Sequence, residues 1–101
     1  MELTGKYVTI LVVEPWDWGQ RRLNGVVETE TADNKIIVRC SKRITGNKFR
    51  SHLIQLSPRY EGDNFVSLSK NKTVTVGGAL IRERTGELDY VFIGTVKIGL
   101  V

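Results

Sequence analysis

Positive charge gathers in one stretch of the chain, between Lys35 and Arg59, and Phe49 and His52 are interleaved with it. This stretch holds seven of the fifteen Lys and Arg residues and contains no Asp or Glu. Cations neutralise phosphate groups, and flat aromatic rings offer surfaces on which bases stack. Because β-forming residues are interleaved with the charges, we expect a folded basic surface and not a disordered tail. The formal net charge of +4 at pH 7 raises the expectation of a polyanionic partner.

Two groups of residues are candidates for binding single-stranded DNA or RNA. The first would contact phosphates or stack on bases, and its members are Lys35, Arg39, Lys42, Arg43, Lys48, Phe49, Arg50, Arg59 and Tyr60. The second would stack on bases or contact a partner, and its members are Trp16, Trp18, Arg21 and Arg22. The two tryptophans are two positions apart, so in an extended segment both rings would point to the same side.

Two alternatives to nucleic-acid binding stay open from the sequence. Trp, Tyr and Arg dominate the hot spots of protein interfaces, so the Trp16–Arg22 loop also fits a protein partner or a homo-oligomer. Carboxylates could also neutralise the basic strand face, because Glu28 and Glu30 lie on the strand expected to pair with Lys35–Arg43. Such cross-strand ion pairs would leave fewer cations for a ligand.

The residues needed for catalysis or metal binding are sparse. Cys40 is the only cysteine and His52 the only histidine, which excludes a CxxC site and a site of several histidines. His52 has no nucleophile elbow beside it, and a strand histidine is usually structural. Glu14 and Asp17 flank a tryptophan in a turn, where acids are usually solvated. We therefore predict a protein that is not an enzyme and that holds no cofactor and no metal.

The sequence predicts a cytoplasmic protein that does not interact with a membrane. A lone cysteine allows no intramolecular disulfide, which fits a reducing compartment. Residues 1–10 lack the basic start and apolar run of a secretory signal, and no apolar stretch of about 18 residues is present.

Apolar alternation between turn-forming residues predicts an all-β chain. The expected strands are Lys6–Val13, Leu23–Thr31, Lys35–Arg43, Lys48–Leu56, Phe65–Ser69, Thr73–Arg82 and Asp89–Val101. Apolar residues on both faces of the first strand predict burial on both sides, or one strand bent between two sheets. The pair Gly77-Gly78 predicts a bulge or sharp bend within its strand. No window shows a helical period, so we expect little or no helix.

These elements predict one small all-β domain over residues 1–101, a barrel of six or seven strands. A long bent first strand, a hairpin of the next two and a closing hairpin resemble the architecture of an oligonucleotide-binding (OB) barrel. An SH3-like barrel or a short sandwich also fits. The resemblance concerns the fold alone and implies no activity. The hypothesis is a non-catalytic barrel that binds single-stranded DNA or RNA through its basic strand face, with a protein-interaction or self-associating module as the alternative.

Overall fold

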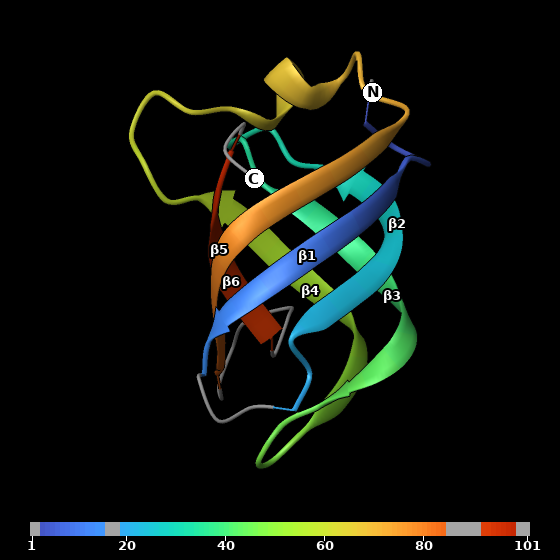
Figure 1. The fold of residues 1–101 in the computed structure, drawn as a ribbon, viewed down its shortest axis with the longest axis vertical. Coiled ribbons are helices and arrows are strands. Elements are labelled where there is room, and N and C mark those ends of the chain that lie inside the picture. Colours follow the sequence, from blue (N-terminus) through green and yellow to red (C-terminus); the bar gives the residue numbers. More distant parts are fainter. Residues whose placement is uncertain (1–2, 16–18, 85–91, 99–101) are drawn as a thin grey trace.

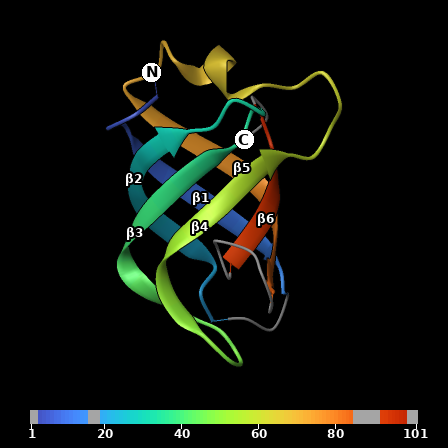
Figure 2. The ribbon, with the colours of Figure 1, turned by 180° about the vertical axis from the view of Figure 1, so that it is seen from behind.

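The computed structural model describes residues 3–15, 19–84 and 92–98, which form a closed barrel of β-strands (Figures 1 and 2). The strands are β1 (Tyr7–Glu14), β2 (Arg22–Glu30), β3 (Ile36–Thr45), β4 (Arg50–Pro58), β5 (Thr73–Glu83) and β6 (Phe92–Lys97). They follow one another around the barrel in the order β1-β2-β3-β4-β6-β5, and β5 pairs with β1 to close it. The predicted small all-β barrel of six or seven strands is confirmed.

Two parallel pairings, β1 with β5 and β4 with β6, complete the ring, and the other neighbouring strands are antiparallel. Parallel neighbours need a long crossover connection. The connection from β4 to β5 passes over one end of the barrel and contains the short 3₁₀-helix η1 (Phe65–Leu68) (Figure 1). Phe65 and Leu68 are buried in the core, so this connection closes that end.

Strand β1 buries one face only, which corrects the prediction that both of its faces are buried. Val8, Ile10 and Val12 point into the core, where none is more than 4% exposed. Tyr7 and Val13 point outward and are 69% and 45% exposed. The physical reason is that a single sheet closed on itself has one dry side, the barrel interior. The outward apolar side chains of β1 therefore remain available for contact with a ligand.

The predicted irregularity at Gly77-Gly78 is present. The pairing of β5 with β6 shifts register between Gly77 and Leu80, and Gly78 has φ +58°. A side chain at Gly78 would both strain this backbone and lie about 3.0 Å from the Lys97 side chain. The bulge bends β5 so that one strand can pair with both β1 and β6.

The strand predicted for Phe65–Ser69 is instead the helical turn η1. The side chain of Asn64 accepts a hydrogen bond from the Ser67 N–H at 3.1 Å, which caps the start of the turn. In a turn of this kind Phe65 and Leu68 lie on the same side, so both reach the end of the core. Among the described residues, no helix is long and apolar enough to cross a membrane.

Candidate nucleic-acid interface

The β3–β4 hairpin extends past the end of the barrel opposite η1 and carries much of the basic stretch (Figure 1). Its strands pair as far as Thr45 and Arg50, and the Gly46 N–H closes the turn by donating to the Phe49 carbonyl at 2.8 Å. The exposed cations of this hairpin make no ion pair with any described residue, and they are Lys42, Arg43, Lys48 and Arg50. Cations that no neighbouring carboxylate neutralises are suited to contact phosphates.

The carboxylate of Glu83, at the end of β5, holds the hairpin turn in place. The backbone N–H groups of Asn47, Lys48 and Phe49 all donate to it, over 2.6–3.0 Å. Successive N–H groups that converge on one anion form a backbone nest. Gln20 supplies a second anchor through two hydrogen bonds to the backbone at the end of β3. The hairpin cations and Phe49 are therefore presented on a positioned loop.

Replacing Glu83 with glutamine should loosen this turn. An amide cannot accept from all three N–H groups as a carboxylate does, and hydrogen bonds to charged groups are the stronger ones. Since the site is exposed, we expect local opening to become easier by about 1–2 kcal/mol, which is roughly tenfold faster amide exchange at Asn47, Lys48 and Phe49. Hydrogen exchange followed by NMR measures this. Glu61→Gln, at an exposed acid beyond the far end of β4, is the control, and equal exchange in both variants would contradict the anchoring role.

An open hollow of about 710 Å³ lies on the outer faces of β1 to β4 and extends as far as Ser41 and His52. The outward side chains around it are Tyr7, Thr9, Asn24, Val26, Arg39, Ser41 and His52. Tyr7 is 69% exposed and presents an aromatic ring at the β1 side. Ser41 and His52 lie on the two strands that continue into the hairpin. The hollow therefore combines a ring, hydrogen-bonding groups and a cation beside the hairpin charges.

His52 and Cys40 contribute structure and hydrogen bonding to this hollow. His52 Nδ1 lies 2.8 Å from the Cys40 carbonyl oxygen, and because a carbonyl only accepts, Nδ1 carries the proton. The other ring nitrogen, Nε2, is thereby left for a ligand. Burial raises the pKa of the Cys40 thiol to about 11, so this group stays protonated at neutral pH and is a poor nucleophile.

Two residues of the predicted basic set, Arg39 and Lys35, form ion pairs. Arg39 donates to the Glu28 carboxylate across β2 and β3, at 3.1 Å from Nε, which confirms the cross-strand pairing considered from the sequence. Glu30 does not pair with the basic stretch and accepts the Leu3 N–H at 2.6 Å. Exposed pairs of this kind contribute only about 0–1 kcal/mol, so a phosphate can compete with Glu28 for Arg39.

The structure places the other predicted residues of the stretch at the opposite end of the barrel. Arg59 and Tyr60 follow β4, and at about 3.3 Å per residue they lie roughly 30 Å along the strand from Arg50. Arg59 is half-buried, and its Nε and Nη2 atoms have no hydrogen-bond partner among the described residues. Lys35 precedes β3 at this same end, where it pairs with Asp33 at 3.3 Å.

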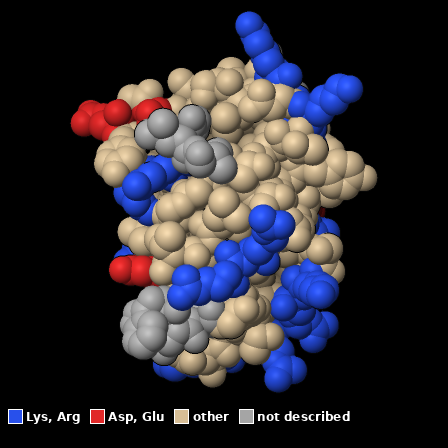
Figure 3. All heavy atoms as spheres, viewed as in Figure 1, with Lys and Arg blue, Asp and Glu red and all other residues tan. Residues whose placement is uncertain are grey.

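Of the Trp16–Arg22 loop, Arg21 and Arg22 are exposed where β2 begins, whereas Trp16 and Trp18 lie outside the described residues. Figure 3, which has the same view as Figure 1, shows Lys and Arg side chains gathered over the lower half of the molecule, around the start of β2 and toward the β3–β4 hairpin. The Asp and Glu atoms visible in the same view lie at its edges. Positive charge thus predominates from the start of β2 toward the hairpin.

No protein-family model, curated protein or solved structure matches this chain. Within the part of the chain that the structure describes, no group of three or more His, Cys, Asp or Glu residues is placed to hold a metal ion.

Sequence reasoning missed Tyr7 as a surface aromatic and gave His52 no binding role. The sequence did carry a signal for Tyr7. Val8 and Ile10 share one face of the strand and are buried, and Tyr7, one position before Val8, therefore points to the opposite, outer face. No comparable signal existed for His52, since its place in the hollow depends on which strands flank β4.

Proposed function

We propose that this chain is a non-catalytic β-barrel that binds single-stranded DNA or RNA with little sequence preference. The observation that supports this most is the hairpin with its four exposed cations, which no described carboxylate neutralises, beside an open hollow that presents Tyr7. Single-strand binding needs a cationic path for the backbone and flat side chains for the bases. The proposal also includes binding across the outer face of the sheet, as in an OB barrel, and a cytoplasmic location.

In the proposed path, the strand runs from the hollow toward the hairpin tip. Tyr7 and Phe49, which are 69% and 37% exposed, would stack on bases. Arg39 would bind phosphate at the hollow, and the hairpin cations would follow the backbone beyond it. The Ser41 hydroxyl would donate to a sugar or phosphate oxygen, and Nε2 of His52, which only accepts, would take a hydrogen bond from a donor such as a ribose hydroxyl. This combination favours binding that tolerates many sequences, because every base has a face that stacks.

Titration of a labelled mixed-sequence oligonucleotide of about 12 nucleotides tests the proposal. We expect micromolar binding by fluorescence anisotropy, which weakens steeply between about 50 and 200 mM salt as phosphate contacts are screened. Quenching of tryptophan fluorescence in parallel would bring the Trp16–Arg22 loop into the site. The absence of binding at low salt would overturn the proposal and direct attention to a protein partner or to self-association of that loop.

The aromatic part of the proposal is tested by two matched tyrosines. Tyr7→Ala should weaken oligonucleotide binding by about 1–3 kcal/mol, the usual cost of losing one base-stacking ring. Tyr60→Ala removes a ring that is also exposed, at 51%, but at the far end of β4, and should change affinity little. Equal losses in the two variants, measured by the same titration, would contradict the path through the hollow.

A further inference from the structure

A second concave site lies on the opposite side of the barrel from the hollow. The hollow is centred on β2, and a groove of about 520 Å³ crosses the outer faces of β4, β6 and β5. In the ring order β1-β2-β3-β4-β6-β5, strand β6 is three places from β2 in either direction. The two sites therefore face away from each other and do not share outward side chains.

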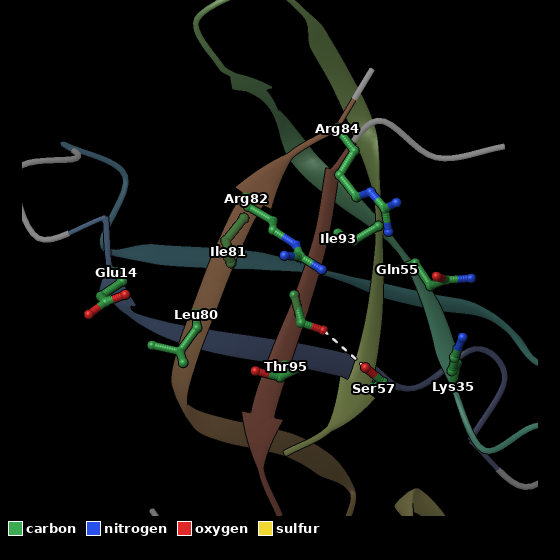
Figure 4. Close-up of a pocket in the computed structure, with 11 residues that line it drawn as sticks. Glu14, Lys35, Gln55, Ser57, Leu80, Ile81, Arg82, Arg84, Ile93 and Thr95 are labelled. Atoms are coloured by element: carbon green, nitrogen blue, oxygen red, sulfur yellow. Dashed lines mark hydrogen bonds between the residues drawn. The ribbon is translucent and has the colours of Figure 1, made fainter. Parts of the chain in front are cut away.

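Three cations from two separate parts of the chain converge on this groove (Figure 4). Arg82 lies on β5 and Arg84 directly follows that strand. Figure 4 shows Arg82 extending over β6 and Arg84 extending toward β4. Neither guanidinium forms an ion pair with a described residue, and both residues are exposed. Lys35 enters from the far side, beyond β4, with its ammonium 3.3 Å from Asp33.

The rest of the groove supplies hydroxyl groups and an apolar strip. Ser57 and Thr95 line the groove further along β4 and β6 from the arginines. The Ser57 hydroxyl donates to the Gly94 carbonyl at 3.5 Å, a long bond that a better acceptor could replace. Leu80 and Ile93 are half-exposed and line the apolar part. The carboxylate in the groove, Glu14, lies at the other extremity, beyond Leu80.

We propose that this groove binds the phosphate group of a small organic phosphate. Two guanidinium forks side by side match the oxygens of a phosphate, and arginine is the side chain best suited to bind it bidentately. The hydroxyls of Ser57 and Thr95 add neutral donors. The apolar strip takes the organic part of the ligand, and Glu14 keeps the negative group at the arginine end. The volume lies in the range of small-molecule sites.

The two arginines could bind the phosphate of a free metabolite or a phosphate in the backbone of a bound oligonucleotide. The arginine end of the groove adjoins the hairpin turn, because Glu83 accepts from the N–H groups of Asn47 and Lys48. The apolar strip of Leu80 and Ile93 favours the free phosphomonoester, because it offers contacts for an organic group beside the phosphate. The inference does not require the proposed nucleic-acid interface, because the groove shares no lining residue with the hollow. Loss of oligonucleotide binding would leave it standing.

The experiment is an NMR titration of the ¹⁵N-labelled chain with adenosine 5′-monophosphate, with adenosine as the ligand that lacks phosphate. We expect saturable shifts at the amides of Ser57, Ile93 and Thr95 with the monophosphate and none there with adenosine. Arg82→Ala/Arg84→Ala should weaken this binding at least tenfold. Arg82→Lys/Arg84→Lys keeps both charges and should retain part of the affinity, which separates loss of the fork from loss of fold.

Two further arms locate the site. Lys70→Ala/Lys72→Ala removes the same charge from exposed lysines beside η1 and should leave monophosphate binding unchanged. A saturating oligonucleotide should not displace the monophosphate. The proposal is overturned by an absence of saturable shifts, by equal binding in the Arg82→Ala/Arg84→Ala variant, or by competition between the two ligands.

Discussion

A Gly25→Ala variant is expected to lose about 3 kcal/mol of unfolding free energy, a large share of the 5–15 kcal/mol typical of a small domain. The added methyl group would lie 2.3 Å from the Arg39 carbonyl oxygen and 2.9 Å from the Cys40 Cα, a closeness that side chains do not tolerate. Both atoms belong to the backbone of β3, which pairs directly with Gly25. No rotamer change can relieve this clash, so β2 and β3 would have to separate.

Chemical and thermal denaturation, each followed by tryptophan fluorescence, measure this loss. We expect the melting temperature to fall by about 12–24 °C, since 1 kcal/mol corresponds to roughly 4–8 °C in a domain of this size. Gly19→Ala is the matched control, because a methyl group there would have no atom of the described residues within 4 Å, its two chain neighbours aside. If the two variants unfold at the same denaturant concentration, the close approach of β2 and β3 does not require glycine at position 25.

The barrel itself follows from local patterns that the sequence displays. Val8, Ile10 and Val12 alternate with outward residues, and Gly77-Gly78 marks the bulge where β5 bends. The helical turn at Phe65 escaped prediction because four residues are too few to show a helical period. Its formation depends on the Asn64 cap and on the open end of the core.

The site was harder to predict because proximity in sequence is not proximity in a barrel. The basic stretch runs along β3 and back along β4, so its middle forms the hairpin tip while Lys35 and Arg59 lie at the other end. Residues in extended strands separate by about 3.3 Å per position. Conversely, Lys35 meets Arg82 in one groove only because β6 inserts between β4 and β5, a strand order that no local pattern encodes.

The Lys48→Ala/Arg50→Ala variant is expected to bind single-stranded oligonucleotide about 25-fold more weakly at roughly 0.1 M salt. For single strands, each phosphate contact contributes about 0.7 to the slope of log affinity against log salt. At 0.1 M this corresponds to roughly a fivefold gain per contact, and two contacts multiply to about 25-fold. Both side chains are exposed on the turn that Glu83 holds, so their removal should leave the fold intact.

Lys70→Ala/Lys72→Ala removes the same two charges at the other end of the barrel, where the connection through η1 reaches β5. Anisotropy titrations over a range of salt concentrations compare the two variants. If binding depends on contacts at the hairpin, its variant should lose about 1.4 from the salt slope. The control should lose distinctly less, because Lys72 lies beside Tyr7 but away from the hairpin. If net charge alone attracts the strand, both slopes should change alike, because a diffuse attraction does not depend on where the cations lie. The second outcome would remove the hairpin from the proposed interface, even if the oligonucleotide still binds.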